Sequence, residues 1–416
     1  MAPRTPRTSR ALRPAIVVGC AALVASLAGA GGASLAAPPD AAAPDAASKP
    51  RCTGSVPFVA GTEGYSAFRI PAIVTAPSGA LLAFAEGRSA GLGDAGNIDL
   101  VLKRSTDGGC AWGPLQVIHD SGNNTSGNPS PVVTATGRVV LLSTYNGGTA
   151  SEAAIMRGEV PAEASRRVFV QYSDDSGATW SPQREITDQA KAADWRWYAT
   201  GPGHAIRLAH GPHRGRLVVP ANHSTAPPAG SPDLGNEAKY YGGHLLYSDD
   251  DGTTWHIGAV DDNPNGYLNV NETTVAELPD GRVYVNARDQ NGSSPGNRGD
   301  AYSLDGGETL AKPHRPQGTL VVPAVQGSVL QLAGGGAPLL FSGPGDPANR
   351  VALTLRTSTD QGATWRDALA LSGLPAAYSD LVQLNPATVG VLYETGDFGP
   401  NETITFRRVA VRDLRP

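Results

Sequence analysis

An eight-residue pattern, Ser-x-Asp-x-Gly-x-Thr-Trp, recurs five times along this chain and limits what the chain can fold into. The five copies begin 68, 75, 55 and 55 residues apart and read STDGGCAW from Ser105, SDDSGATW from Ser173, SDDDGTTW from Ser248, SLDGGETL from Ser303 and STDQGATW from Ser358. Aspartate can accept hydrogen bonds from its own turn, glycine permits positive φ, and a terminal tryptophan can pack back onto a sheet. Each copy therefore predicts a hairpin turn, and we call these segments Asp boxes.

Short apolar runs precede the boxes, and 51 glycines and 34 prolines separate many such runs along the chain. This composition predicts an all-β protein of many short strands. About 365 residues remain after the N-terminal region, and at roughly 60 residues per unit they suit a six-bladed β-propeller with four antiparallel strands per blade. The boxes lack the late glutamate of a calcium-binding loop, so we assign them to structure and expect neither metal nor cofactor.

The N-terminal region has the layout of a secretory signal peptide. Four arginines between positions 4 and 13 precede an uncharged apolar run over 15–30. We expect a signal peptide over 1–37, a disordered Ala/Pro-rich lead-in over 38–51 and one catalytic propeller over 52–416. A lipoprotein signal with acylation at Cys20 is the alternative, disfavoured because Arg13 leaves little apolar sequence before it. The predicted location is extracellular, with no membrane attachment.

Charge and cysteine content fit a secreted protein. Loss of residues 1–37 removes four arginines and no acids, so the formal charge moves from −5 to −5 − 4 = −9. Such an acidic chain is a poor candidate for nucleic-acid binding. Cys52 and Cys110 would remain, and an even pair in an oxidising compartment predicts a disulfide, with two free thiols as the alternative.

The segment SAFRIPAIVTA places a permanent cation, Arg69, inside a strand-like apolar run. Taken alone, Arg69 would be read as a solvated side chain or half of a structural ion pair. The motif FRIP together with several Asp boxes, however, resembles the bacterial exo-α-sialidase (neuraminidase) family, whose fold is a six-bladed propeller. The resemblance runs from about residue 52 to the C-terminus. It implies hydrolysis of terminal α-linked sialic acid, with sialylated glycoproteins, glycolipids or oligosaccharides as substrates.

The resemblance assigns a carboxylate-binding site. Sialic acid carries a carboxylate on its anomeric carbon, and planar arginines bind carboxylates in a bidentate fashion. The matching positions are Arg69 in FRIP, Arg288 in YVNARDQ and Arg350 in PANRVAL. Glu394 in VLYETG matches a glutamate that supports the first arginine. Each of these residues, taken singly, could be an ordinary surface charge.

The resemblance also assigns the reacting groups. Tyr378 in AAYSDL matches a tyrosine nucleophile, which avoids the repulsion that an attacking carboxylate would meet at a carboxylate-bearing carbon. Glu272 in NVNETT matches the partner that takes the tyrosine proton. Asp94 matches the acid/base aspartate of a glycine-rich loop, a role that requires a raised pKa. Asp99 competes with Asp94 in the sequence, and we expect it to begin the next strand.

Four further positions are weaker candidates for the pocket. Arg88 resembles an arginine that holds a ring hydroxyl, and it could equally be structural. Asn128 stands in GNPSP where many relatives have aspartate, and its amide could bind the same hydroxyl. Tyr198 and Thr200 lie in DWRWYATGPGHAI, a segment rich in aromatic residues and glycine, as a pocket wall would be; its tryptophans could equally be packing residues.

Two other functions share most of these residues. A non-catalytic sialic-acid-binding propeller would keep the arginines and lose Tyr378, Glu272 or Asp94, all of which are present. A transglycosylating or anhydro-sugar-forming relative would keep the whole site, because the difference lies in how water or an acceptor reaches the intermediate. We expect a monomer.

Overall fold

The computed structural model describes residues 52–262, 267–291 and 293–414. The predicted signal peptide and lead-in lie outside the described residues. Strands dominate the described part, with two short α-helices, α1 (Glu152–Arg157) and α2 (Thr187–Ala190), and four short 3₁₀ turns at Ala162–Ala164, Ala238–Tyr240, Pro295–Asn297 and Val411–Leu414. None of these helices is long and apolar enough to cross a membrane.

The strands form six groups, each built around four antiparallel strands, which we number as blades one to six. Two blades share one continuous sheet, joined only by a parallel pair between Ile98 and Thr125. Blade one consists of β2 (Ala67–Thr75), β3 (Leu81–Arg88), β4 (Ile98–Ser105) and β5 (Gln116–His119), and blade two of β6 (Thr125–Val133), β7 (Val139–Asn146), β8 (Arg167–Ser173) and β9 (Arg184–Glu185). Blade three consists of β10 (Trp195–Thr200), β12 (Leu217–Thr225), β13 (Tyr241–Ser248) and β14 (His256–Asp261), with β11 (Ile206–Arg207) beside β12, and blade four of β15 (Val270–Glu277), β16 (Val283–Asp289), β17 (Arg298–Ser303) and β18 (Arg315–Pro316). Blade five consists of β19 (Ser328–Gln331), β20 (Leu339–Pro344), β21 (Leu353–Ser358) and β22 (Arg366–Ala370), and blade six of β23 (Ala376–Asn385), β24 (Thr388–Thr395), β25 (Thr403–Ala410) and β1 (Gly54–Val59).

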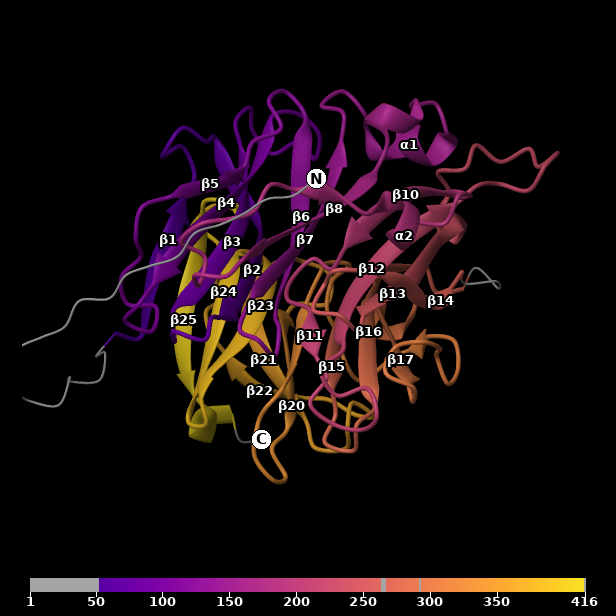
Figure 1. The fold of residues 1–416 in the computed structure, drawn as a ribbon. Coiled ribbons are helices and arrows are strands. Elements are labelled where there is room, and N and C mark those ends of the chain that lie inside the picture. The colour runs from indigo at the N-terminus through magenta and orange to yellow at the C-terminus, as the bar shows by residue number, and fades with distance from the viewer. Residues whose placement is uncertain (1–51, 263–266, 292, 415–416) are drawn as a thin grey trace, which may run out of the picture. The chain divides into compact units, whose positions relative to one another are not determined.

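The innermost strands of the six blades make a closed ring. In order, β2, β6, β10, β15, β19 and β23 each contact the next, and β23 contacts β2. Figure 1 shows the indigo strands of blade one beside the yellow strands β24 and β25, so the two ends of the described chain meet. The predicted six-bladed β-propeller with four antiparallel strands per blade is confirmed.

Six apolar clusters fill the spaces between neighbouring blades. Between blades six and one, for example, Phe58 and Phe406 pack with Phe68 and Ile73, and all four are buried. Equivalent clusters lie between each of the other five pairs of neighbours. Both faces of the second strand of a blade are therefore buried, which explains why β3 (LLAFA) and β7 (VVLL) begin with continuous apolar runs instead of alternating ones.

Each Asp box is the turn between the third and fourth strands of its blade, as predicted. In the box of blade three, Ser248 Oγ donates to Asp250 Oδ1 at 2.9 Å and accepts from Gly252 N at 3.0 Å. Thr254 donates its N–H and hydroxyl to the two oxygens of Asp250, at 2.8 and 2.7 Å. The boxes at Ser173, Ser303 and Ser358 repeat these bonds. Hydrogen bonds to the serine and aspartate side chains thus close the turn.

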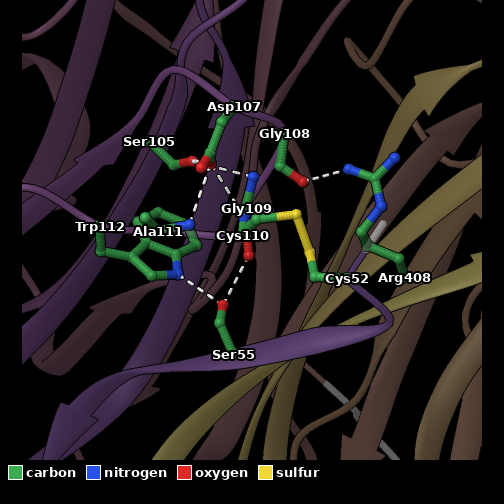
Figure 2. Close-up of a disulfide and its surroundings, with 10 residues drawn as sticks. All are labelled: Cys52, Ser55, Ser105, Asp107, Gly108, Gly109, Cys110, Ala111, Trp112 and Arg408. Carbon is green, nitrogen blue, oxygen red and sulfur yellow. Dashed lines mark hydrogen bonds between the residues drawn. A yellow bond between two sulfur atoms is a disulfide. The ribbon is translucent and has the colours of Figure 1, made fainter. Parts of the chain in front are cut away.

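Blade six has no Asp box because the chain does not turn there. Its third strand is β25, but its fourth strand is β1, which comes from the other end of the described chain. A disulfide between Cys52 and Cys110 joins the start of β1 to the Asp box of blade one, as predicted. Figure 2 shows how Arg408 of β25 donates to Gly108 O, and how Trp112 Nε1 donates to Ser55 Oγ at 2.8 Å, across the same junction. We call this junction of blades six and one the closure seam.

Candidate active site

A polar cavity opens near the propeller axis at the end where the innermost strands begin. All six blades contribute to it, and the lining residues are Arg69, Ile70, Glu86, Arg88, Asp94, Thr125, Asn128, Glu152, Arg166, Trp197, Ala199, Asn271, Glu272, Arg288, Gln290, Arg350 and Tyr378. Eight of the residues predicted from the sequence are among them: Arg69, Arg88, Asp94, Asn128, Glu272, Arg288, Arg350 and Tyr378. The closure of the ring therefore brings together residues that lie up to 309 positions apart in the sequence, from Arg69 to Tyr378.

β-Bulges in the innermost strands turn side chains toward this cavity. The strand register shifts between Arg69 and Ala72, and similar shifts occur in β6, β10, β15 and β23. Ile70 has φ of 59° and Asn128 has φ of 53°, and each precedes a proline. Positive φ is a strained conformation for a β-branched residue such as isoleucine. The Ile-Pro of FRIP is thus the bulge that directs Arg69 out of the regular strand alternation.

Arg69 is held by a buried carboxylate. Its Nε and Nη2 each donate to one oxygen of Glu394 at 3.1 Å, which is a bidentate pair. The side chain of Glu394 is 0% exposed, and its oxygens also accept from the backbone N–H of Ile70 at 2.9 Å and of Tyr378 at 3.2 Å. One edge of the guanidinium, formed by Nε and Nη2, is thus fixed to the protein, and Nη1 lies outside this pair.

Tyr378 lies at the centre of the predicted group. Its hydroxyl donates to Glu272 Oε1, and Glu272 Oε2 accepts from Arg288 Nη1 at 2.9 Å. The Cζ atoms of Arg69 and Arg350 lie 5.0 and 6.0 Å from the centre of the tyrosine ring. The three predicted arginines therefore converge around one phenol, from blades one, four and five.

The tyrosine is protonated in this arrangement. Burial, followed by the charge of Glu272, raises the pKa of the Tyr378 hydroxyl well above its ordinary value, while Arg288 and Arg69 lower it. The hydroxyl consequently keeps its proton at neutral pH and presents it to Glu272. A buried phenol that donates to a carboxylate fixed by an arginine is suited to lose its proton as a new bond forms at oxygen.

Asp94 stands at the cavity rim in the loop between β3 and β4. Its side chain is 72% exposed, and Oδ1 pairs with Arg88 Nη1 at 2.8 Å. Arg88 also donates to the carbonyls of Leu92 and Gly93, at 2.6 and 3.0 Å, and to Glu86. In the absence of a ligand, Arg88 thus holds the Asp94 loop, and its predicted contact with a ring hydroxyl stays a prediction. Asp99 lies inside β4 and accepts from Tyr65 at 2.7 Å, away from the cavity lining.

Three charged lining residues escaped the sequence analysis: Glu86, Glu152 and Arg166. Glu86 Oε1 accepts from the backbone of Asn128 at 2.9 Å. Glu152 comes from α1, accepts from the Tyr241 hydroxyl, and has a raised pKa chiefly because it is buried. Burial likewise lowers the pKa of Arg166 to about 10. No motif marks them in the sequence: Glu86 lies in β3, Glu152 in α1 and Arg166 directly before β8.

The expectation for Tyr198 is corrected by the structure. Its side chain is 0% exposed in the core between blades two and three, 4.9 Å from the ring of His244, and it does not line the cavity. The physical reason is strand alternation after the bulge in β10, which turns Trp197 and Ala199 toward the cavity and Tyr198 away from it. Thr200 also misses the lining, and its hydroxyl donates to the Asn128 carbonyl at 2.6 Å. Trp197 is the aromatic wall residue of this segment.

The described residues offer no evident metal site. No group of three or more His, Cys, Asp or Glu side chains among them is arranged to hold a metal ion. Several acidic residues in or beside the cavity instead pair with arginines, as in Arg69–Glu394, Arg88–Asp94 and Arg288–Glu272. Such a set can bind an anion and move a proton between oxygen atoms.

Comparisons with known proteins show which proteins this chain resembles. Residues 79–391 match the BNR repeat-like domain. A curated protein named Sialidase from Micromonospora viridifaciens is 32% identical over 81% of this chain and 51% of its own length, so this chain spans about half of that relative. An Exo-alpha-sialidase from Aspergillus fumigatus is 31% identical over 80% of each chain. Among solved structures, the Hadza microbial sialidase Hz136 superposes with a TM-score of 0.73 at 28% identity, covering 87% of this chain and 69% of that one.

Proposed function

Because this chain belongs to the sialidase family, we propose that it is an exo-α-sialidase, a glycoside hydrolase that removes terminal α-linked sialic acid with retention of the anomeric configuration. The observation that carries the proposal is the contact of the Tyr378 hydroxyl with Glu272, directly beside Arg69, Arg288 and Arg350. A carboxylate held by those arginines would place its own carbon, and the attached anomeric carbon C2, next to the phenol oxygen.

The first half of the reaction forms a bond between Tyr378 and the sugar. The phenol oxygen attacks C2, and its proton passes to Glu272, to which it is already hydrogen-bonded. The bond from C2 to the leaving oxygen breaks, and Asp94 gives that oxygen a proton. Arg288 stabilises Glu272 before the transfer, and the arginines hold the carboxylate throughout.

The second half releases the sugar. Asp94 takes a proton from water, the water oxygen attacks C2 from the face that the leaving group vacated, and the bond between C2 and Tyr378 breaks. Glu272 returns its proton to the phenolate oxygen. Asp94 is exposed at the cavity rim, and bound substrate would cover it and exclude water from around it. Two inversions at C2 give net retention.

The biological setting is also a proposal. Sialylated glycoproteins, glycolipids or oligosaccharides are the substrates that this chemistry serves. Support for secretion comes from the arginine-rich and then apolar sequence of residues 1–37, and from the Cys52–Cys110 disulfide. We propose an extracellular monomer that binds neither nucleic acid nor a membrane.

Hydrolysis of a synthetic α-sialoside, followed by NMR from the first seconds, tests this function. The α anomer of free sialic acid should appear first and then convert to the β anomer. Release of the β anomer first would exclude retention, and absence of free sialic acid would exclude the hydrolase.

The variant Tyr378→Phe tests the nucleophile in the same assay. It keeps the ring and the arginine contacts and loses the attacking oxygen, so kcat should fall by roughly 10³-fold or more. Near-normal turnover by a folded Tyr378→Phe protein would remove Tyr378 from this role.

A further inference from the structure

A second pocket opens at the other end of the innermost strands from the active-site cavity. The strand β15 contributes Asn271 and Glu272 to the cavity at its start, and its last three residues line the second pocket. This pocket has a volume of about 520 Å³ and lies between blades three, four and five. We call it the distal pocket, and its walls are mostly apolar, from Ile206, Val275, Ala276, Leu330 and Leu332.

A buried histidine reaches the distal pocket with one ring nitrogen unpaired. His204 is 8% exposed and belongs to the lining. Its Nδ1 lies 2.7 Å from Asp380 Oδ1, and its backbone N–H donates to Asp380 Oδ2 at 3.0 Å. Asp380 does not line the pocket, so this edge of the ring faces away from it. Nε2, on the other side of the ring, has no hydrogen-bond partner among the described residues.

Asp380 determines which hydrogens the His204 ring carries. The carboxylate of Asp380 is 0% exposed and also accepts from Ile73 N at 2.9 Å and from Ser328 Oγ at 2.8 Å. Because a carboxylate can only accept, Nδ1 of His204 carries a hydrogen. Burial lowers the pKa of His204, but Asp380 outweighs burial and raises it. In the protonated ring Nε2 is a donor as well, and a ligand oxygen that accepts from it removes the cost of a buried, unpaired N–H.

The remaining charged groups of the distal pocket favour a negative ligand. Arg207 is exposed in the lining and forms no ion pair within the described part of the chain. The acidic lining residue, Glu277, is already occupied: it accepts from the backbone N–H groups of Ala209 and His210 at 2.6 and 2.9 Å, and lies 3.3 Å from the His210 ring. The groups left to meet a ligand are therefore the imidazole of His204 and the guanidinium of Arg207.

We propose that the distal pocket binds a monocarboxylic acid with an apolar chain, whose carboxylate accepts a hydrogen bond from His204 Nε2 while the chain packs against the apolar walls. A mostly apolar pocket with a few polar groups is the usual form of a small-molecule site. A charge-assisted hydrogen bond fixes the head group, and burial of the chain supplies the rest of the affinity. The site is separate from the active-site cavity, so it stands independently of the proposed reaction.

Calorimetric titration with hexanoate tests this site, with hexanol and acetate as the two partial ligands. Hexanol keeps the chain without the charge, and acetate keeps the charge without the chain. The wild-type protein should bind hexanoate at least roughly 10-fold more tightly than either. His204→Gln should raise the Kd of hexanoate by roughly 10-fold, because the charged hydrogen bond is lost. Absence of hexanoate binding, or equal affinity for hexanoate and hexanol, would overturn the proposal.

Three further variants locate the bound hexanoate. Ala333→Trp places a large side chain at an exposed position of the pocket lining and should weaken binding; it carries the test if His204→Gln does not fold. Arg350→Gln removes a cation of the active-site cavity that could itself bind a carboxylate, and should leave the Kd unchanged. His256→Gln, at an exposed histidine outside both pockets, should also leave it unchanged. A Kd that responds to Arg350→Gln, or to neither variant of the distal pocket, would place the ligand elsewhere and refute the assignment.

Discussion

Glu394 connects the guanidinium of Arg69 with the backbone of Tyr378 through one buried side chain. Its two oxygens hold the Arg69 fork and the backbone N–H groups of Ile70 and Tyr378. All of these partners are hydrogen-bond donors, which suits a carboxylate because its oxygens can only accept. The position of Arg69 relative to Tyr378 is thereby fixed before any ligand arrives.

The variant Glu394→Gln tests that connection. The amide would bring N–H donors toward groups that are themselves donors, and Arg69 would lose its buried counter-charge. We expect the free energy of unfolding to fall by about 3 kcal/mol and KM to rise. Denaturant titration and steady-state kinetics measure the two effects.

Glu402→Gln is the matched control for Glu394→Gln. Glu402 also accepts backbone N–H groups, from Asp397, Phe398 and Gly399, but it does not line the cavity. Its variant should leave KM unchanged. Unchanged stability and KM in Glu394→Gln would show that Glu394 does not position Arg69.

A histidine pair behind β10 predicts acid sensitivity. His223 Nδ1 and His244 Nδ1 lie 3.0 Å apart, and burial is the main cause that lowers the pKa of both below 6.5. Since the unfolded chain binds these protons more readily, the stability they contribute is present above pH 6.5 and is lost as the pH falls below it. The slope reaches about 1.4 kcal/mol per pH unit for each proton.

Unfolding titrations between pH 7.5 and 5 measure this effect, and His244→Gln should flatten the slope. His204 contributes to stability in another pH range. Burial lowers its pKa, but Asp380 outweighs burial and raises it, so its contribution is present below pH 6.5 and declines at higher pH. A slope in His244→Gln equal to that of the wild type would assign the acid sensitivity to other groups.

Whether a single site residue could be predicted from the sequence depends on whether it stands in a motif. FRIP, the arginines and Tyr378 were predicted and lie together, although their chemical roles remain proposals. Arg166 and Glu152 stand in no motif, and only the folded structure brings them to the cavity, where they contact Asn128 and Tyr241. Tyr198 was assigned to the wrong face because a bulge, invisible in the sequence, shifts the alternation of β10.

At the scale of elements, the tryptophan of an Asp box packs its own blade against the preceding blade. Trp255 closes the box of blade three and is buried among Val140, Leu142 and Val170 of blade two. The ring centre of Trp180, in the box of blade two, lies 5.7 Å from that of Phe84 of blade one. The ring centre of Trp112, in the box of blade one, lies 5.6 Å from that of Phe406 of blade six. The sequence predicted that these tryptophans pack on a sheet, but not which sheet, because only the closed ring defines the neighbour.

Trp255→Ala should therefore weaken an interface between blades. Removing a fully buried indole costs about 3–5 kcal/mol, because the apolar contacts are lost and a cavity remains. Thermal unfolding measures the change. Leu234→Ala, at a position 64% exposed, is the control and should change stability by less than about 0.5 kcal/mol. A Trp255→Ala protein as stable as the wild type would mean that the box tryptophans do not join the blades.

At the scale of the whole propeller, the closure seam replaces a continuous chain with pairing between its two ends. β1 pairs with β25, and the Cys52–Cys110 bond spans 58 residues from that pairing to blade one. The cysteines lie at the far end of the strands from the cavity, beside the Asp box of blade one (Figure 2). The seam should thus support stability without touching the chemistry.

The double variant Cys52→Ala/Cys110→Ala tests the seam. In the chain-entropy account, opening a loop of this size removes about 4 kcal/mol of stability. For a domain of this length, that loss corresponds to a Tm lower by roughly 5 °C. KM should not change, and wild-type protein treated with a reductant should unfold at the same temperature as the variant. A changed KM with an unchanged Tm would contradict the prediction that the disulfide affects stability and not substrate binding.

The pairing of β1 with β25 also sets an order of events during synthesis. β1 ends at Val59 and its partner begins at Thr403, so a ribosome must add 344 residues before β1 can find its place. At ordinary elongation rates that interval lasts roughly 20 to 70 s. Through this time β1 has no partner strand. Once β25 emerges, its edge stays open until β1 pairs with it, and a strand of another chain could occupy that edge. Blade six is the last to form, and capture of that edge by a second copy is the misassembly to which this topology is most exposed.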